Sequence, residues 1–498
     1  MPSPASMPIL KALQGQHPLI MLKSPEEERV QRLITEALTA AGQPTCNAIW
    51  RTTSGLEIDG SPLAGSDHPV DALRAFLKSP SQTIIFLDLI PFLQDQQVIR
   101  ALRDACQELR KRGTGHLFLV ASQSVLPSSL EKEICLLEIP LPDSEELRAQ
   151  VSTHTAAQNL SLPESLMNEL ALSLRGLTEH EVDHVMHQVS HADLCGDDEE
   201  QADLIRDAIF EAKAMMGRKA GYLEYVPTHR GLAEIGGMEV LREWIDKRAS
   251  LFTQESYEAG LPLPKGILLM GVSGCGKSLA AKTVAAIWKV PIFRLDFNVI
   301  FSGLYGSPEA TFHQALKTIE SVAPAVVWID EIENGLGMRA NAGSTDQNQI
   351  FSAFLTWMQE KPPMIFVAAT ANHIESLPAE IIRKGRFDQV FFCDLPGNEE
   401  RDAIFKIHLA RNGADVDAID VAYLVIATEG WNGAEIEQVV IAARIDAYTD
   451  NRAMTTRDVS RHIRSNVPLS ETMAEQIKAI REWAWGRATT ASKTKQRL

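Results

Sequence analysis

The stretch GILLMGVSGCGKS, residues 266–278, decides how the second half of this chain folds. Its first five residues form a continuous apolar run, which is typical of a strand buried on both faces of a parallel sheet. Residues 271–278 fit the pattern G-x-x-x-x-G-K-[ST], which binds phosphate when it follows a strand and opens a helix. The sequence therefore predicts a strand over 266–270, a glycine-rich loop, and a helix over 278–288.

The glycine-rich loop contains the residue types that phosphate binding requires. Its glycines let backbone N–H groups surround phosphate oxygens at the N-terminus of the helix. We expect Lys277 to reach the β- and γ-phosphates of a nucleotide, and the hydroxyl of Ser278 to bind Mg²⁺. The residues predicted to contact the nucleotide here are Gly271, Val272, Ser273, Gly274, Cys275, Gly276, Lys277 and Ser278.

An acidic pair, Asp330 and Glu331, follows a second apolar run at 325–329. A carboxylate at the end of a buried strand can hold the coordination shell of Mg²⁺, and we assign this role to Asp330. Glu331 comes next in the chain, and we expect it to polarise the attacking water as a general base.

A third apolar run, at 364–368, is followed by Thr370 and Asn372. The amide of Asn372 at this strand end can orient water against the γ-phosphate. Arg383 and Arg386 follow on a turn, and an arginine placed against the γ-phosphate of a neighbouring subunit stabilises the charge of the transition state. We therefore assign Asn372, Arg383 and Arg386 to catalysis.

Similar stretches occur in the same order in both halves of the chain. The pairs are PLIML and GILLM, IIFLDLI and VVWIDEI, LFLVAS and IFVAAT, PLPDSEE and DLPGNEE, and GLTEHEVDHV and GWNGAEIEQV. Apolar runs at 83–87 and 116–121 in the first half are also predicted to be strands. Amphipathic segments lie between the apolar runs, and this alternation predicts an α/β fold with parallel sheets. The ordered matches favour two tandem copies of one module. The plainer alternative is that any two α/β domains share such runs.

The first copy lacks the chemistry of the second. Its stretch KSPEEERV, residues 23–30, replaces the glycine-rich loop, and Glu26, Glu27 and Glu28 would repel phosphate. Arg29 falls at the position of the loop lysine, and Leu89 replaces the general base. We therefore predict that this copy binds no ATP and has a structural or substrate-engaging role.

Composition limits the class of protein. The 498 residues are 45% hydrophobic and 23% charged, which is ordinary for a globular protein. The formal net charge is −17, so the surface repels nucleic-acid backbones and we expect no nucleic acid as partner. Six cysteines without a Cys-x-x-Cys pair are typical of a reduced, cytoplasmic chain. We expect no signal peptide and no membrane segment.

These motifs resemble the AAA family of ring-forming ATPases between residue 230 and about residue 440. The matching pieces are EIGG (234–237), the P-loop, WIDE, ATAN and RKGRFD. The resemblance implies Mg²⁺-dependent ATP hydrolysis in a homo-oligomer, a hexamer in this family, with Arg383 and Arg386 as the two finger arginines. It also implies that Ile235 lines the adenine pocket and that Gly433 and Ala434 contact the nucleotide from a helical lid.

A narrower resemblance covers nearly the whole chain. The stretches LEYV, GLAEIGGMEVLREWIDKRASLF, VVWIDEIENGL and PLSETMAEQIKAIREWAWGRA are similar to the AAA proteins called hypothetical chloroplast reading frame forty-six (ycf), of plastids, cyanobacteria and other bacteria. That family also carries a degenerate AAA-like half before its active one. The expected fold is therefore α/β, with tandem P-loop-type modules that each have a helical lid, the first degenerate and the second an active AAA ATPase.

The expected domain boundaries follow from these matches. We expect a first module with its lid over 1–195, a helical linker over 196–228, the ATPase core over 229–396, and a helical lid with a C-terminal helix over 397–487. The polar, basic tail over 488–498 is expected to fray.

Two features are open to more than one interpretation. In SGLYGSPEA, residues 302–310, Leu304 and Tyr305 are candidates for contact with a peptide in a central pore, although Tyr305 can equally pack the loop. His180, Glu181 and His184 fit the zinc pattern H-E-x-x-H. Because Glu181 occupies a repeat position shared with Glu435, we favour a lid helix there over a metal site.

The leading hypothesis is a ring ATPase that remodels or regulates an unknown protein partner, with its active site between subunits. The alternative is a slowly hydrolysing, nucleotide-gated scaffold or regulator that threads no substrate. Handling of DNA or RNA would need a basic stripe, which the sequence lacks outside the short tail.

Overall fold

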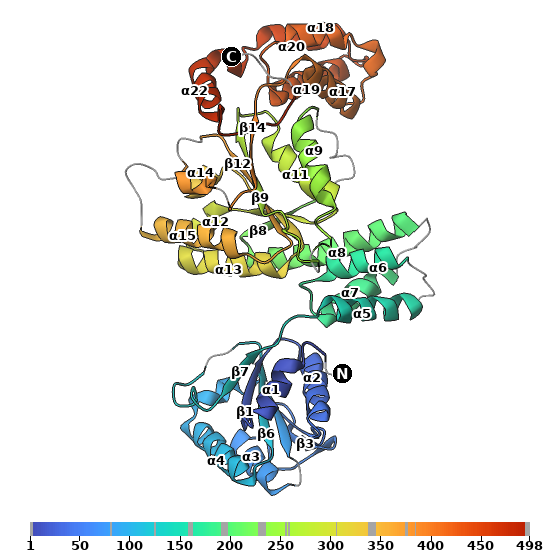
Figure 1. The fold of residues 1–498 in the computed structure, drawn as a ribbon. Coiled ribbons are helices and arrows are strands. Elements are labelled where there is room, and N and C mark those ends of the chain that lie inside the picture. Colours follow the sequence, from blue (N-terminus) through green and yellow to red (C-terminus); the bar gives the residue numbers. More distant parts are fainter. Residues whose placement is uncertain are drawn as a thin grey trace. The chain divides into compact units, whose positions relative to one another are not determined.

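The structure is a computed structural model that describes most of the chain (Figure 1). The described residues are 3–79, 82–123, 126–157, 163–190, 198–227, 236–253, 256, 259–304, 306–336, 345–373, 377–383 and 385–493. They divide into two compact units: 1–150 with 177–184, and 151–176 with 185–498. The division passes through two helices, α5 (Ser144–Ala157) and α7 (Glu179–Ser190).

The first unit is built on a seven-stranded sheet in the order β4-β3-β2-β5-β6-β1-β7. Its strands are β1 (Leu19–Lys23), β2 (Ala48–Arg51), β3 (Gly55–Ile58), β4 (Ser61–Pro62), β5 (Thr83–Leu87), β6 (His116–Ala121) and β7 (Cys135–Glu138). Its helices are α1 (Met7–Gln14), α2 (Glu27–Ala40), α3 (Pro69–Lys78), η1 (Ile90–Gln94) and α4 (Gln96–Arg112).

Strand alternation sends the side chains of this sheet into two apolar layers. Leu19 and Met21 of β1 pack with α3 and α4, whereas Ile20 and Leu22 pack with α1 and α2 on the other face. Figure 1 shows the sheet between these two helix pairs. Burial on both faces explains why the central strands are continuous apolar runs.

The second unit has its own seven-stranded sheet, in the order β14-β13-β9-β12-β11-β10-β8. Its strands are β8 (Leu223–Val226), β9 (Gly266–Gly271), β10 (Ile292–Leu295), β11 (Ala325–Ile329), β12 (Ile365–Ala371), β13 (Gln389–Cys393) and β14 (Thr489–Thr490). The helices around it are α6 (Glu164–Leu174), α8 (Asp198–Ala220), α9 (Glu239–Ala249), α11 (Lys277–Trp288), α12 (Phe297–Phe301), α13 (Pro308–Ser321), α14 (Ile332–Leu336), α15 (Thr345–Glu360) and α16 (Ala379–Ile382).

The two faces of this sheet are again covered by different helices. Ile267 and Leu269 of β9 pack with α9 and α11, and Leu268 and Met270 pack with α12, α13 and α15. A separate apolar cluster holds together α17 (Asn398–Arg411), η3 (Val416–Ala418), α18 (Val421–Ala427), α19 (Gly433–Thr449) and α20 (Thr456–Ser465). Two further helices, α21 (Leu469–Thr472) and α22 (Ala474–Ala484), lead to β14.

The two sheets share the same central topology. The order β7-β1-β6-β5-β2 in the first matches β13-β9-β12-β11-β10 in the second, and every neighbouring pair in both series is parallel. The predicted strands at 83–87, 116–121 and 325–329 have the observed bounds, and the strand predicted at 364–368 extends to Ala371. The α/β class is therefore confirmed: the central strands of both sheets are parallel, and the edge strands β3, β4 and β8 are antiparallel to their neighbours.

One expectation differs from the structure. The tail expected to fray contains β14, and Ala491 is 1% exposed. Polar composition suggested a free tail, but backbone hydrogen bonds to β13 hold it regardless of side-chain polarity.

Among the described helices, none combines the length and the apolar character that spanning a membrane requires.

Candidate nucleotide-binding site

The loop between β9 and α11 has the strand–loop–helix context that its motif requires. Gly271 has φ +142°, and a Cβ there would lie 2.0 Å from the carbonyl oxygen of Cys393. Gly274 has φ +77°, and a Cβ there would lie 2.8 Å from the side chain of Asn432. Backbone conformation and close packing therefore both demand glycine at these positions.

The loop opens onto a cleft of about 430 Å³ within the second unit. Many predicted site residues line it: Ser273, Gly274, Cys275, Gly276, Lys277, Ser278, Asp330, Glu331, Asn372, Gly433 and Ala434. The start of α19 contacts the loop directly, because the amide of Ala434 donates to the carbonyl oxygen of Gly274 at 3.1 Å. Segments more than 150 residues apart in the chain thus meet at one cleft, as the predicted site requires.

Lys277 lies under the loop and is 6% exposed. Its Nζ donates to the carbonyl oxygens of Gly271 at 2.9 Å and Val272 at 2.8 Å, so these two residues lie behind the lysine. Burial lowers the pKa of Lys277 from its ordinary value. An anion in the cleft would supply the countercharge that two neutral carbonyls do not.

Asp330 is the centre of a polar network at the ends of β11 and β12. Its Oδ1 accepts from Thr370 Oγ1 at 2.6 Å and from Ser278 Oγ at 3.1 Å. Thr370 Oγ1 in turn accepts from the backbone N–H of Glu331 at 2.9 Å. The extra length of β12 beyond the predicted strand is what places the Thr370 hydroxyl between the two acidic residues.

Glu331 is held by two amides. Its Oε1 accepts from Asn372 Nδ2 at 2.8 Å, and its Oε2 accepts from Asn334 Nδ2 at 2.7 Å. Its backbone has φ +48°, a conformation that is uncommon for glutamate and found more often at functional sites. The predicted general base and the predicted water-orienting asparagine are therefore in direct contact.

Glu333 is a buried carboxylate that the sequence analysis missed. Its Oε1 accepts from the backbone amides of Asn372 at 2.7 Å and His373 at 3.1 Å. Its Oε2 has no hydrogen-bond partner in the part of the chain that the structure describes. The only sequence feature that pointed to Glu333 was its place as the third acidic residue in DEIE. Its contact with Asn372 depends on how the strands pair, and the spacing of residues along the chain does not reveal that contact.

Arg383 and Arg386 are not among the described residues that line this cleft. Arg383 is exposed, and Arg386 donates to the carbonyl oxygen of Glu380. Asp388 anchors the turn that carries them, since its Oδ2 accepts from the amides of Lys265 at 2.6 Å and Gly266 at 3.0 Å. The turn that carries the two arginines is thereby hydrogen-bonded to the beginning of β9, the strand that leads into the glycine-rich loop.

The remaining lining is partly apolar and includes one face of α17. Among these residues are Gly236, Met238, Pro396, Ile404, Ile407, His408 and Arg411. An apolar wall suits a planar nucleobase. Burial lowers the pKa of His408, so the imidazole favours its neutral form. The spacing of residues 404, 407, 408 and 411 shows from sequence that they share one face of a helix. Spacing alone does not show that this face lines the nucleotide-binding cleft.

Comparisons with known proteins agree with this geometry. Residues 267–395 match the ATPase family associated with various cellular activities (AAA), and residues 8–139 match the SpoVK-like AAA ATPase, N-terminal domain. The "Uncharacterized AAA domain-containing protein ycf46" of Pyropia yezoensis is 33% identical over 494 residues, which are 97% of this chain and 98% of that protein. This chain belongs to the ycf46 family of AAA proteins. 

Other relatives extend the comparison. The ycf46 protein of Guillardia theta is 33% identical over 95% of this chain and 93% of its own length. The "ATP-dependent zinc metalloprotease FtsH 2" of Petrotoga mobilis is 31% identical over 234 residues, which are 45% of this chain and 37% of that protein. The ycf46 likeness thus covers both units, whereas the FtsH likeness covers less than half of the chain.

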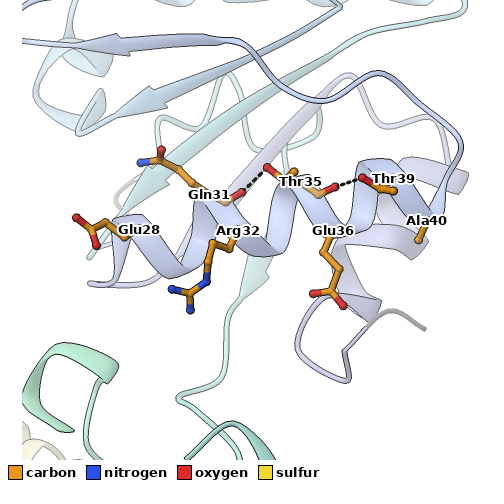
Figure 2. Close-up of a pocket in the computed structure, with 7 residues that line it drawn as sticks. All are labelled: Glu28, Gln31, Arg32, Thr35, Glu36, Thr39 and Ala40. Carbon is orange, nitrogen blue, oxygen red and sulfur yellow. Dashed lines mark hydrogen bonds between the residues drawn. The ribbon is translucent and has the colours of Figure 1, made fainter. Parts of the chain in front are cut away.

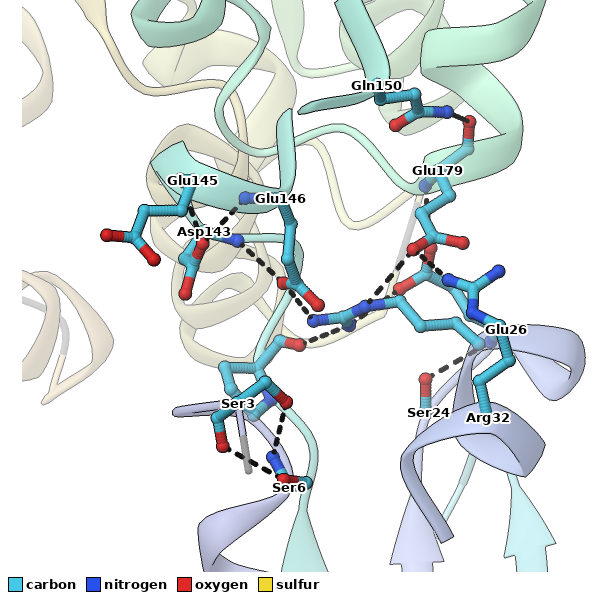
Figure 3. Close-up of polar contacts among 12 residues, drawn as sticks. Ser3, Ser6, Ser24, Glu26, Arg32, Asp143, Glu145, Glu146, Gln150 and Glu179 are labelled. Carbon is cyan, nitrogen blue, oxygen red and sulfur yellow. Dashed lines mark hydrogen bonds and ion pairs between the residues drawn. The ribbon is translucent and has the colours of Figure 1, made fainter. Parts of the chain in front are cut away.

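In this ycf46-family chain, an arginine lies where the first unit would need a phosphate-binding lysine. Arg29 is 1% exposed, and its guanidinium donates to Glu26 at 3.1 Å, to Glu146 at 2.8 Å and to the carbonyl oxygen of Pro140 at 2.6 Å. Its Nε lies 3.7 Å from Glu179. Figure 3 shows the carboxylates of Glu26, Glu146 and Glu179 converging on this point. The arginine is thus already neutralised by carboxylates of its own chain.

A shallow hollow of about 860 Å³ runs along α2 of the same unit. Figure 2 shows its lining spread along one face of the helix: Glu28, Gln31, Arg32, Thr35, Glu36, Thr39 and Ala40. The hydroxyls of Thr35 and Thr39 donate to backbone carbonyls one turn earlier. Among the residues that the structure describes here, no set of donors converges as it does around the loop of the second unit, so this surface does not have the construction of a phosphate site.

Three further expectations concern the pore residues, the adenine pocket and the possible zinc pattern. Leu304 is 79% exposed, which agrees with a residue available for contact, while Tyr305 and Ile235 lie outside the described residues. Glu181 caps its helix, because its Oε2 accepts from the amide and the hydroxyl of Thr178, both at 2.9 Å. That capping role is the one expected of a helix-start residue rather than of a zinc-site base.

Proposed function

We propose that this chain hydrolyses ATP, with Mg²⁺, as a ring-forming AAA ATPase that remodels or regulates a protein partner. The observation that carries the proposal is the continuous polar network from Ser278 through Asp330 and Thr370 to Glu331 and Asn372, beside the buried Lys277. These are the groups that a phosphoryl-transfer site needs, and they converge at one cleft with an apolar wall.

In the proposed reaction, a water molecule attacks the γ-phosphorus while the bond to the β-phosphate oxygen breaks, giving ADP and phosphate. Glu331 accepts the proton of the attacking water, and Asn372 holds the carboxylate of Glu331 in position. Lys277 neutralises charge on the β- and γ-phosphates.

The donor set beside the loop fits Mg²⁺. The Ser278 hydroxyl and the Asp330 carboxylate are hard oxygen ligands, already within 3.1 Å of each other. These two residues would hold the ion together with phosphate oxygens. When bound, Mg²⁺ neutralises charge that develops on the transferred phosphoryl group.

We further propose that the active site is completed by a second subunit. Arg383 and Arg386 lie outside the lining of their own chain's cleft, which supports a role on a neighbour's γ-phosphate. A homo-hexamer is the expectation from the AAA family. Leu304, with Tyr305, is proposed to contact a protein substrate in the central pore, and the absence of Cys-x-x-Cys pairs favours the cytoplasm.

The first unit is proposed to be a degenerate AAA-like module that binds no ATP. The order of its five central strands is the same as in the second unit, and the ion pairs of Arg29 lie after β1, at the position that corresponds to the glycine-rich loop after β9. The proposed boundaries remain 1–195 for this module with its lid, 196–228 for a helical linker, 229–396 for the ATPase core, and 397–487 for the lid and C-terminal helix. The cluster of α17 to α20 is the proposed lid of the active module.

Two variants of the full chain test the proposed function. Glu331→Gln should bind ATP and lose hydrolysis, because it removes the base while its remaining oxygen can still accept from one of the two asparagine amides. Lys277→Ala should lose binding of a fluorescent ATP analogue altogether if the first unit has no site of its own. Normal turnover by Glu331→Gln would refute the assignment, and stoichiometric binding by Lys277→Ala would contradict the degenerate first module. Affinity capture with Glu331→Gln then identifies the partner.

A further inference from the structure

The last described residues of the chain, 489–493, form a segment that we call the C-terminal strap. Thr489 and Thr490 pair in parallel with Phe391 and Phe392 of β13. The amide of Ala491 donates to the carbonyl oxygen of Phe392 at 2.9 Å, and Gln389 Nε2 donates to Thr489 Oγ1 at 2.6 Å. The strap is therefore an integral edge of the second sheet.

The strap also holds the start of α9. The carbonyl oxygen of Ala491 accepts from the amides of Val240 at 3.0 Å and Leu241 at 3.1 Å. The residue before the helix, Met238, has φ +59° and makes no side-chain cap. The strap thus supplies the acceptor that the first turn of the helix lacks, and it fixes the turn from which Met238 projects into the cleft.

Ser492 links the strap to α17 through one buried carboxylate. Its hydroxyl donates to Glu400 Oε1, which also accepts from the amide of Met238 at 3.4 Å. The other oxygen of Glu400 accepts from the amide of Gly397 at 2.7 Å. Gly237 is packed so closely here that a Cβ would lie 2.3 Å from Glu400 Oε1. The C-terminal strap, the turn at Gly237 and Met238, and the start of α17 therefore meet at the carboxylate of Glu400.

Ser492 itself lines the nucleotide cleft, next to the apolar wall that includes Met238 and Ile404. The phosphates have their partners in Lys277 and Ser278, so the apolar wall is where a nucleobase fits. We propose that the C-terminal strap is part of the nucleotide site: it holds this wall in place, and the affinity for ATP depends on it. The inference rests on the proposed function.

Truncation of the full chain tests the strap, with Glu331→Gln as parent to prevent turnover. One variant ends at Ala488 and lacks the strap, and a matched control ends at Lys493 and keeps it. A third variant carries Ser492→Ala. Affinity is measured by titration with a fluorescent ATP analogue, and each protein is also titrated with inorganic tripolyphosphate as competitor, which has the phosphates without a nucleobase.

If the strap is part of the nucleotide site, the control ending at Lys493 should bind ATP like the parent. The variant ending at Ala488 should bind ATP about tenfold or more weakly, and Ser492→Ala several-fold more weakly, as expected for loss of a hydrogen bond to a charged group. The affinity for tripolyphosphate should change little in all three. A defect that merely loosened the fold would weaken both ligands alike.

The inference is overturned if the strap deletion binds ATP like the parent, or if ATP and tripolyphosphate lose affinity equally. If the variant ending at Ala488 fails to fold, by its circular dichroism spectrum, Ser492→Ala decides the matter, and its unchanged ATP affinity overturns the inference. A parent that binds no ATP, or binds it equally with and without Lys277→Ala, refutes the proposed function instead, and the role of the strap with it.

Discussion

Replacing Thr370 with valine removes one hydroxyl from the centre of the proposed catalytic network. Valine keeps the shape of threonine, and Thr370 is 1% exposed, so the change leaves packing nearly intact. Two hydrogen bonds are lost: the donation to Asp330 at 2.6 Å and the acceptance from the amide of Glu331 at 2.9 Å. Asp330 and Glu331 would then be free to move relative to each other.

The bond to the Asp330 carboxylate is charge-assisted, and such a bond contributes about 1.5–3 kcal/mol. If that energy is used to position the two acidic residues in the transition state, kcat for ATP hydrolysis falls by about tenfold to a hundredfold, since 1.4 kcal/mol is tenfold in rate. The KM for ATP should change little, because Lys277 and the loop backbone are untouched. Phosphate release at saturating ATP measures the effect.

Thr370→Ser is the matched control, because it keeps the hydroxyl and loses only a methyl group. It should retain most of the wild-type kcat. If Thr370→Val hydrolyses ATP within about twofold of Thr370→Ser, the hydroxyl does not position the acidic pair and the reasoning fails. A loss of ATP affinity equal to the loss of kcat would also contradict it, because the effect would then lie in binding.

Three further predictions concern the oligomer, the first unit and pH. Mixing Arg386→Ala with Glu331→Gln should restore ATPase activity above that of either variant alone, because mixed interfaces join an intact base to an intact arginine; no gain on mixing would argue against a site between subunits. Arg29→Leu should lower the unfolding free energy by about 3–5 kcal/mol in denaturant titration, since it leaves a buried carboxylate unpaired. Arg32→Leu, which breaks an exposed pair, should cost about 1 kcal/mol or less, and equal losses would contradict the buried cluster. Burial lowers the pKa of Lys361 from 10.5 to about 7. Between these values the unfolded chain binds a proton that the folded chain does not, so stability should rise with pH from 7 towards 10, and Lys361→Met should flatten that rise in thermal melts.

Much of the fold could be read from local pattern. The central strands are buried on both faces, so each appears as a short apolar run, and the predicted runs became β5, β6 and β11 with the observed bounds. The polar edge strand β14 had no such signature, because its place depends on backbone hydrogen bonds to β13. For the same reason Ala491, in a polar tail, proved to be buried.

By itself, the sequence determined the phosphate loop and the parallel α/β class, because both depend on residues that are neighbours in the chain. It also determined that the first unit has no such loop. Only the tertiary structure decided which side chains complete the cleft. Glu333 reaches Asn372 through the pairing of β11 with β12, Ile404 arrives on α17, and Ser492 arrives on the C-terminal strap. These residues meet because sheet register and helix packing bring distant segments together, and no spacing along the chain encodes that meeting.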